Sequence, residues 1–476
     1  MQLTRTLIVS TVAATLAALA LPGGTARAGN LSSYEGASWY GKYLSVSGGA
    51  VATCVGDPGP LTFGTNVDAS HECGSQSETF IATKASGSVV IAGSNEIQRL
   101  PMRAMASTDG GSTFTGVDLP LPPPISKGGF RFGSDPTIAF DSHGNAYYGY
   151  IVVFFSAGGA INGTEMAVAR SSDDGHSWSS TYFALQTGSG QFNDKPMITV
   201  DTSRAHRDRI YLAWDNATGN SSSSKNGNNV VLSSSDDGGV SFTAPVSVSG
   251  DFVGRTGGIG ADPYVTPTGA LHVAWQDYAH GAIVDVSSTD GGRTFSARHT
   301  VATVNAFDFA IAAMASRGAL VYPSCGAYSS MLFCSYTNGS SAATSVYVAT
   351  SRDGGTTWSS SAVPAGGDQF NQWLAVDAST GAVDVAYYDT GAHGATPTRY
   401  TLARSHSGGP FTSTTVASAP TDESCCAPSV DLGNQYGDYE GLAAGGGLVH
   451  PVWTDRRQAV VELGLREEVL TATLPS

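Results

Sequence analysis

The chain has 476 residues, of which 41% are hydrophobic and only 13% are charged. This apolar fraction is large enough for a folded core and argues against global disorder. The formal net charge is −15, with no basic stripe, which argues against nucleic acid or an anionic membrane surface as a partner.

Residues 1–28 have the pattern of a secretory signal peptide. Arg5 gives a positive start, an apolar run extends from Leu7 to Leu21, and Ala26-Arg27-Ala28 supplies a cleavage pattern. The run is short for a helix that must cross ~30 Å of hydrocarbon. We therefore expect export of a mature chain, 29–476, to the periplasm or the extracellular space. We expect it to form one monomeric domain without a membrane span.

Six cysteines fit an oxidising compartment. Six cysteines allow 15 connectivities, so pairing between sequence neighbours is a hypothesis. It predicts the bonds Cys54–Cys73 and Cys325–Cys334 and leaves the adjacent pair Cys425–Cys426. The alternative, in which each thiol pairs elsewhere, stays open.

An octapeptide of the pattern Ser-x-Asp-x-Gly-x-x-aromatic occurs five times, and a degenerate sixth copy begins at Ser405. Each copy predicts a tight turn between two strands, because Asp can bind backbone N–H groups of its own turn and Gly tolerates positive φ. A structural role is favoured over a catalytic one for the five aspartates: Asp109, Asp173, Asp237, Asp290 and Asp353.

A second repeat places an acidic or amide residue before a short apolar strand. A second strand follows and often ends in aspartate. Four strands in each unit of ~60 residues are typical of a β-propeller blade. Seven copies predict an all-β, seven-bladed propeller with four-stranded antiparallel blades, and the six octapeptides leave six blades as the alternative. The copies begin at Glu78, Asp135, Asp194, Asp262, Asp308, Asn371 and Asp438.

The last unit is too short for four strands. We expect the N-terminal segment 29–77, around Ser38–Ser47, to supply the missing strand and close the ring. An open arrangement would leave exposed strand edges.

The octapeptides resemble Asp boxes, also called BNR repeats. From about Gly74 to Leu474 the chain resembles secreted bacterial sialidase-like propellers of the neuraminidase superfamily. The resemblance implies a glycoside hydrolase whose active site lies on the face opposite the Asp boxes. It also implies arginines for a sugar carboxylate, and the candidates are Arg131, Arg255 and Arg456.

Because adjacent strands are antiparallel, the start of strand one and the end of strand two share a face opposite the octapeptides. Candidate catalytic residues there are Glu78, Asp135, Asp194, Asp438 and Glu440. Aromatic rings beside acids suit sugars, which stack and form hydrogen bonds. Candidate substrate-binding residues are Arg131, Lys195, Asp262, Tyr436, Tyr439, Asp455 and Arg456.

Three interpretations of these carboxylates remain open. They cap backbone N–H groups, they catalyse glycoside hydrolysis with one acid protonated and one ionised, or they bind Ca²⁺. The favoured function is a secreted hydrolase that acts on a glycan and requires no cofactor. The alternatives are a non-catalytic propeller that binds carbohydrate or protein, and a polysaccharide lyase that would use Tyr436 or Tyr439.

Overall fold

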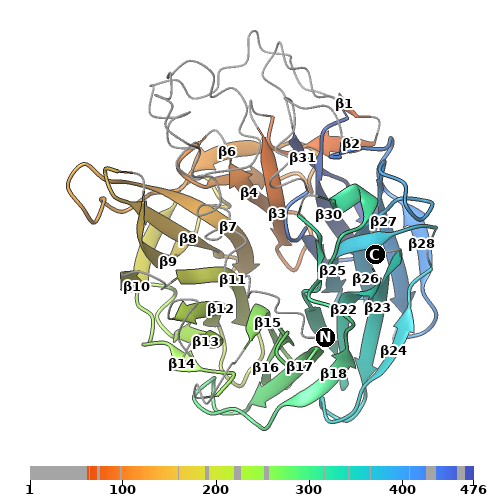
Figure 1. Cartoon of the computed structure of the whole chain (residues 1–476). Coiled ribbons are helices and arrows are strands. Elements are labelled where there is room, and N and C mark those ends of the chain that lie inside the picture. The colour runs from red at the N-terminus through yellow and green to blue at the C-terminus, as the bar shows by residue number, and fades with distance from the viewer. Residues whose placement is uncertain are drawn as a thin grey trace, which may run out of the picture.

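The computed structural model shows seven β-sheets arranged as blades around a central axis (Figure 1). This confirms the all-β, seven-bladed prediction. One short 3-10 turn, Ala312–Met314 (η1), is the only helical element in the part of the chain that the structure describes. The described residues are 62–63, 65–71, 75–96, 99–158, 160–187, 192–218, 227–250, 257–315, 317–340, 343–364, 366–406, 408–424, 436–457 and 467–476.

The first six blades are each formed by four consecutive antiparallel strands. Blade one contains β3 (Gln76–Thr83), β4 (Val90–Glu96), β5 (Arg103–Ser107) and β6 (Thr115–Asp118). Blade two contains β7 (Phe130–Phe140), β8 (Ala146–Phe155), β9 (Ile161–Ser171) and β10 (Ser179–Thr187). Blade three contains β11 (Phe192–Asp201), β12 (Arg209–Thr218), β13 (Gly227–Ser235) and β14 (Val246–Ser247).

The next three blades follow the same order. Blade four contains β15 (Gly258–Val265), β16 (Leu271–Asp277), β17 (Ala282–Ser288) and β18 (His299–Thr303). Blade five contains β21 (Ser324–Tyr328), β22 (Met331–Ser340), β23 (Ala343–Ser351) and β24 (Ser359–Ala362). Blade six contains β25 (Gln369–Val376), β26 (Ala382–Asp389), β27 (Arg399–His406) and β28 (Thr412–Thr415).

Blade seven joins the two ends of the described chain. Its C-terminal strands are β29 (Leu442–Gly445), β30 (Leu448–Asp455) and β31 (Glu468–Thr471), and β32 (Leu474–Pro475) also pairs with β30. The N-terminal strand β2 (Asn66–Asp68) pairs antiparallel with β31 and carries β1 (Thr62–Phe63) on its other edge. The stretch Ser38–Ser47, for which this pairing was expected, lies outside the described residues.

The expected inner blade strand at Asp308 is wrong. Asp308–Phe309 (β19) pairs with Ala319–Leu320 (β20) in a separate two-stranded sheet, and β21 is the first strand of blade five. The sequence carries a sign of this insertion, because Asp308 follows Asp262 by only 46 residues while the other copies lie 57 to 68 residues apart.

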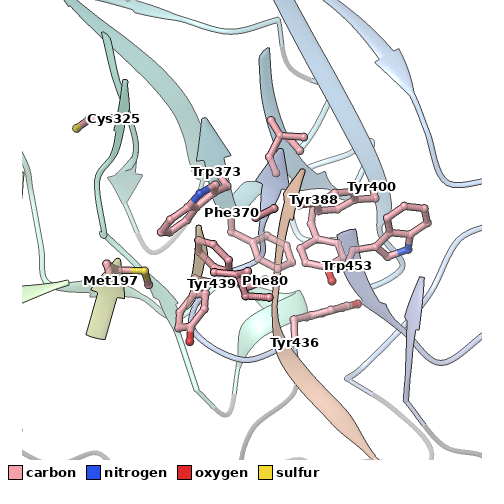
Figure 2. Close-up of a cluster of buried hydrophobic side chains, with 14 of the residues drawn as sticks. Phe80, Met197, Cys325, Phe370, Trp373, Tyr388, Tyr400, Tyr436, Tyr439 and Trp453 are labelled. Atoms are coloured by element: carbon pink, nitrogen blue, oxygen red, sulfur yellow. The ribbon is translucent and has the colours of Figure 1, made fainter. Parts of the chain in front are cut away.

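Aromatic side chains from several blades form much of the largest buried cluster (Figure 2). Phe80 of blade one lies edge-on to Trp373 of blade six, with ring centroids 5.4 Å apart. Tyr400 stacks on Trp453 of blade seven at 5.1 Å. The first contact joins blades one and six across blade seven, and the second joins the neighbouring blades six and seven.

The complete octapeptides all form the same turn between the third and fourth strands of a blade. In blade two, Ser171 Oγ donates to Asp173 Oδ1 (2.8 Å) and accepts the N–H of Gly175 (2.9 Å). Asp173 also accepts the backbone N–H and the hydroxyl of Ser177 (2.9 and 2.6 Å). These hydrogen bonds lower the pKa of Asp173 to about 2. The aspartates therefore satisfy donors of their own turns.

A Ser171→Ala substitution tests this turn. Ser171 is buried, so the variant leaves the N–H of Gly175 without its acceptor. We expect a loss of about 1–3 kcal/mol in the free energy of unfolding, measured by urea denaturation. The exposed neighbour provides the control, because Ser172→Ala should change stability by less than ~0.5 kcal/mol. Equal effects would contradict the role of Ser171.

The disulfide Cys325–Cys334 is present and joins directly opposed residues of β21 and β22. This confirms the predicted pair. The other predicted partners, Cys54, Cys73, Cys425 and Cys426, lie outside the described residues.

Removing this disulfide should destabilise the protein. The bond closes a short loop, with a sequence separation of 9 residues. Loop-closure entropy predicts that a Cys325→Ala/Cys334→Ala variant loses about 2–3 kcal/mol in the free energy of unfolding, measured by denaturant titration. An unchanged denaturation midpoint would contradict a stabilising role.

No helix among the residues described here is long and apolar enough to cross a membrane.

Candidate functional site

The inner strands of blades one to three contain a bulge at equivalent positions. The strand register shifts between Ser77 and Phe80, between Ser134 and Thr137, and between Asp194 and Met197. Bulges re-aim a side chain, and positive φ is uncommon for residues other than glycine. The residues with positive φ at these bulges are Glu78 (51°), Asp135 (59°) and Lys195 (50°).

In blade three the repeat position predicted from the sequence is one residue before the bulge residue with positive φ. The sequence pattern matches Asp194 to Glu78 and Asp135, whereas in the structure Lys195 is the residue equivalent to them. Before the first strand of blade seven, the residue with positive φ is Gly437, at 81°, rather than Asp438. A Cβ atom on Gly437 would lie 2.2 Å from Cγ of Glu78, so only glycine fits beside that side chain.

Lys195 lies between three carboxylates. Its Nζ is 2.6 Å from Asp438 Oδ2, 3.4 Å from Asp135 Oδ2 and 3.5 Å from Glu78 Oε2. It also lies 5.5 Å from the ring centre of Tyr439. Burial alone would lower the pKa of Lys195, but these carboxylates raise it well above its ordinary value. Lys195 is therefore a buried cation held by ion pairs.

Arg317 supplies a second cation and was missed from the sequence. It lies in the insertion before blade five, between η1 and β20. Its Nη2 donates to Glu78 Oε1 at 2.8 Å, and its Nε donates to Asp438 Oδ1. The only sequence signal was the break in the repeat spacing. We call Glu78, Asp135, Asp194, Lys195, Arg317 and Asp438 the Lys195 cluster.

Asn95, at the end of β4, connects blades one and two beside this cluster. Its Nδ2 donates to Glu78 Oε2 at 2.7 Å, and its Oδ1 accepts the backbone N–H of Asp135 at 2.7 Å. Ser134 Oγ donates to Asp135 Oδ1 at 2.8 Å. These neutral groups position the two acids, and the repeat pattern gave no sign of them.

Two of the acids in the cluster are held ionised. Burial alone would raise the pKa of Asp438, but Arg317 and Lys195 hold it well below its ordinary range. Burial would also raise the pKa of Asp135, but Lys195 and hydrogen bonds from Ser134 and Asn95 lower it.

The pKa values of the other two acids are raised. Burial and the charges of Asp135 and Asp438 raise the pKa of Asp194 to about 7, against the opposing effect of Lys195. Burial and the same two carboxylates raise the pKa of Glu78 to about 8.

Asp194 is the most accessible acid of the cluster. It is half-buried, while Glu78, Asp135 and Asp438 are 1%, 3% and 5% exposed. Asp215 lies opposite Asp194 in the β11–β12 ladder. Burial and Asp194 raise the pKa of Asp215 well above its ordinary value.

Glu440 and Tyr436 lie in contacts between blades rather than in the Lys195 cluster. Glu440 Oε1 accepts from Tyr388 (2.7 Å), and Oε2 accepts the backbone N–H of Thr79 (3.2 Å). Burial raises the pKa of Glu440 to about 7. Tyr436 is fully buried, and its hydroxyl accepts the N–H of Glu423.

The remaining candidates divide between the cluster and other places. Tyr439 adjoins Lys195, and its hydroxyl donates to the carbonyl of Pro136. Asp262 accepts the backbone N–H of Cys325, and burial raises the pKa of its carboxyl group to about 8. Sequence reasoning grouped Asp262 with the other acids because of its repeat position.

Three further candidates also form local structural contacts. Arg131 Nε donates to the carbonyl of Pro122. Asp455 accepts hydrogen bonds from Trp453 and Arg457. Arg456 Nη1 donates to the carbonyl of Asp422. Arg255 lies outside the described residues.

Among the described residues, no group of three or more His, Cys, Asp or Glu side chains is arranged to hold a metal ion. The cations between the carboxylates of the Lys195 cluster are Lys195 and Arg317.

Comparisons with known proteins give structural similarity only. No family model matches the chain, and no curated protein matches it. The intramolecular trans-sialidase from Ruminococcus gnavus is 14% identical, with a TM-score of 0.47 over 72% of this chain and 95% of that one. The phage phi92 endosialidase is 11% identical, with a TM-score of 0.47 over 89% of this chain and 68% of that one. The Penicillium chrysogenum α-L-arabinanase is 10% identical, with a TM-score of 0.43 over 88% and 99% of the two chains.

Proposed function

We propose that the protein is a glycan-active hydrolase whose reaction takes place at the Lys195 cluster. The observation that carries this proposal is a buried cluster in which Lys195 lies beside carboxyl groups whose pKa values are moved apart: the pKa of Asp194 is raised to about 7, and that of Asp135 is lowered. Two acids with pKa values moved apart are the requirement for paired acid and base roles near neutral pH.

In the proposed reaction, Asp194 donates its proton to the oxygen of the leaving alcohol as the glycosidic bond breaks. The ionised Asp135 removes a proton from the water whose oxygen forms the new bond to the anomeric carbon. Lys195 holds Asp135 ionised, and Arg317 with Lys195 holds Asp438 ionised. One water is consumed, and the two carboxyl groups exchange their protonation states.

The half-buried position of Asp194 supports it as the group that meets the leaving alcohol. Asp135 is less accessible, at 3% exposed, and it is held by Lys195, Ser134 and Asn95.

A non-catalytic carbohydrate-binding propeller is the second candidate function. It is favoured by the ion pairs within the Lys195 cluster, because Lys195 and Arg317 neutralise carboxylates of the cluster itself. A cluster that joins blades in this way does not require a substrate. Turnover separates the two functions.

We also propose that residues 1–28 are a signal peptide and that residues 29–476 act outside the cytoplasm as one propeller domain. The Cys325–Cys334 disulfide supports an oxidising compartment. N-terminal sequencing of the protein recovered from the medium or the periplasm of its host tests this proposal, and an N-terminus at Gly29 is the expected result.

The experiment that tests the function is a turnover panel of sialosides and of neutral and acidic polysaccharides. Reducing ends and the absorbance of unsaturated uronates are recorded together, with and without EDTA. Release of reducing ends is the expected result. New absorbance would assign a lyase, an effect of EDTA would support Ca²⁺, and no turnover by folded protein would favour the binding function.

A further inference from the structure

We propose that blade six carries a second sugar-binding site, distinct from the Lys195 cluster, that takes an uncharged sugar residue of the glycan. The site is a pocket of about 450 Å³ at one edge of the blade, a volume in the range of small-ligand sites. The inference rests on the proposed function only in taking the partner to be a glycan.

Topology places the pocket on the face expected to carry the site. Asp389 ends β26, Arg399 begins β27 and Thr415 ends β28, and all three residues line the pocket. The octapeptide turns connect the other ends of the third and fourth strands. Glu78, near the start of β3, is at the same strand edge as the pocket. A long glycan that crosses this face meets both.

Asp389 and Arg399 provide complementary polar groups in the pocket. They are directly opposed in the β26–β27 ladder. Asp389 is fixed, because its Oδ1 accepts the N–H of Gly391 at 2.7 Å and its Oδ2 accepts the N–H of Gly366 at 3.0 Å. Each carboxylate oxygen retains a second lone pair for a ligand.

The Arg399 guanidinium is available to a ligand. The side chain is exposed, and among the described residues it forms no hydrogen bond or ion pair. Asp389 therefore offers acceptors beside the donors of Arg399. This combination matches adjacent hydroxyl groups of a sugar, which both donate and accept.

The rest of the lining also fits a sugar without charge. Thr401, Ser413 and Thr415 line the pocket, together with Pro364 and Pro397. Proline rings present C–H surface to the apolar face of a sugar. The charges of Asp389 and Arg399 cancel, and the net charge of −15 disfavours a polyanionic glycan.

Binding without turnover tests the inference. Isothermal titration uses xylotetraose, β-1,4-galactotetraose and α-1,5-arabinotetraose as neutral probes, and trigalacturonate and 3′-sialyllactose as charged probes. The protein is tested as wild type and as Asp194→Asn. We expect at least one neutral probe to bind with a Kd of ~1 mM or tighter in both proteins, and the charged probes to bind more weakly.

Arg399→Gln and Asp389→Asn should each weaken this binding by at least about fivefold, because a charged hydrogen-bond partner is lost. Arg293→Gln is the matched control, since Arg293 is an exposed arginine in an octapeptide turn. It should leave the binding unchanged. Because Asp389 also fixes two backbone N–H groups, Arg399→Gln is the decisive variant.

Three results would overturn the inference. They are the absence of neutral-probe binding at ~10 mM, binding of equal strength by Arg399→Gln and wild type, and preferred binding of a charged probe. The proposed function fails separately, because it requires turnover on the panel. If the protein binds a neutral probe through Arg399 but shows no turnover, the sugar-binding pocket is supported and the hydrolase function is rejected.

Discussion

Replacing Asp194 by asparagine should reduce turnover by about 10²–10⁴-fold. The amide keeps the shape of the carboxylic acid but has no acidic proton to give to a leaving alcohol. Because Asp194 is half-buried and its pKa is raised by burial and by neighbouring carboxylates, the variant should fold with little loss of stability. kcat and the thermal midpoint are measured on the same samples.

The pH profile gives this prediction a second readout. The pKa of Asp194 is raised to about 7, so its protonated form, and with it the activity, should decline as the pH rises through about 7. The pKa of Asp135 is lowered, so its ionised form persists well into acid. The residual activity of Asp194→Asn should lose the decline near pH 7.

Asp236→Asn is the matched control for this substitution. Asp236 is an exposed aspartate whose side chain is 69% accessible and pairs with Arg209. It precedes Asp237 of an octapeptide turn, which lies at the strand ends away from the Lys195 cluster. Its replacement should therefore leave kcat unchanged. If Asp194→Asn keeps about a tenth or more of the wild-type turnover, Asp194 is not the acid.

The blades could be predicted because their signals are local and repeated. Each octapeptide contains the donors and acceptors of its own turn, as Ser171 and Asp173 show. The number of blades then followed from the inner-strand pattern. The insertion before blade five was not predicted, because it interrupts the repeat pattern from which the strands were predicted.

The candidate site was predicted only in part, because its geometry depends on backbone conformation and on contacts between distant residues. Glu78, Asp135 and Asp438 were selected as acids, and the structure brings them together. Lys195 was selected only as a binding residue, although the bulge in β11 places it at the centre.

Residues outside the repeat pattern carried almost no sequence signal for the candidate site, and the break in the repeat spacing was the one sign of the insertion that holds Arg317. Arg317 reaches Glu78 across 239 residues, and Asn95 reaches Asp135 across 40. Glu440, in contrast, was predicted as a site residue but lies outside the Lys195 cluster. It resembles its neighbour Asp438 in type and position, but its carboxylate is occupied by Thr79 and Tyr388. Residue type alone could not separate these cases.

Replacing Lys195 by methionine should destabilise the protein by about 3–5 kcal/mol at pH 8, because buried carboxylates lose the cation between them. Methionine keeps an apolar stem of similar length, so the loss comes chiefly from the ion pairs. The free energy of unfolding is measured by denaturant titration. Lys127→Met is the control, since Lys127 is exposed and its replacement should change the free energy by less than ~0.5 kcal/mol.

The sign of the pH dependence separates lost ion pairs from lost packing. In the wild type the lowered pKa values of Asp438 and Asp135 contribute stability above their unfolded pKa values, and that stability declines on acidification. Without Lys195, the pKa values of the buried carboxyl groups should rise above their unfolded values. The folded variant then takes up protons as the pH falls, and this uptake stabilises it. The difference in the free energy of unfolding between wild type and Lys195→Met should therefore become smaller from pH 8 to pH 4. A difference that stays constant over this range would show that Lys195 stabilises the fold through packing alone.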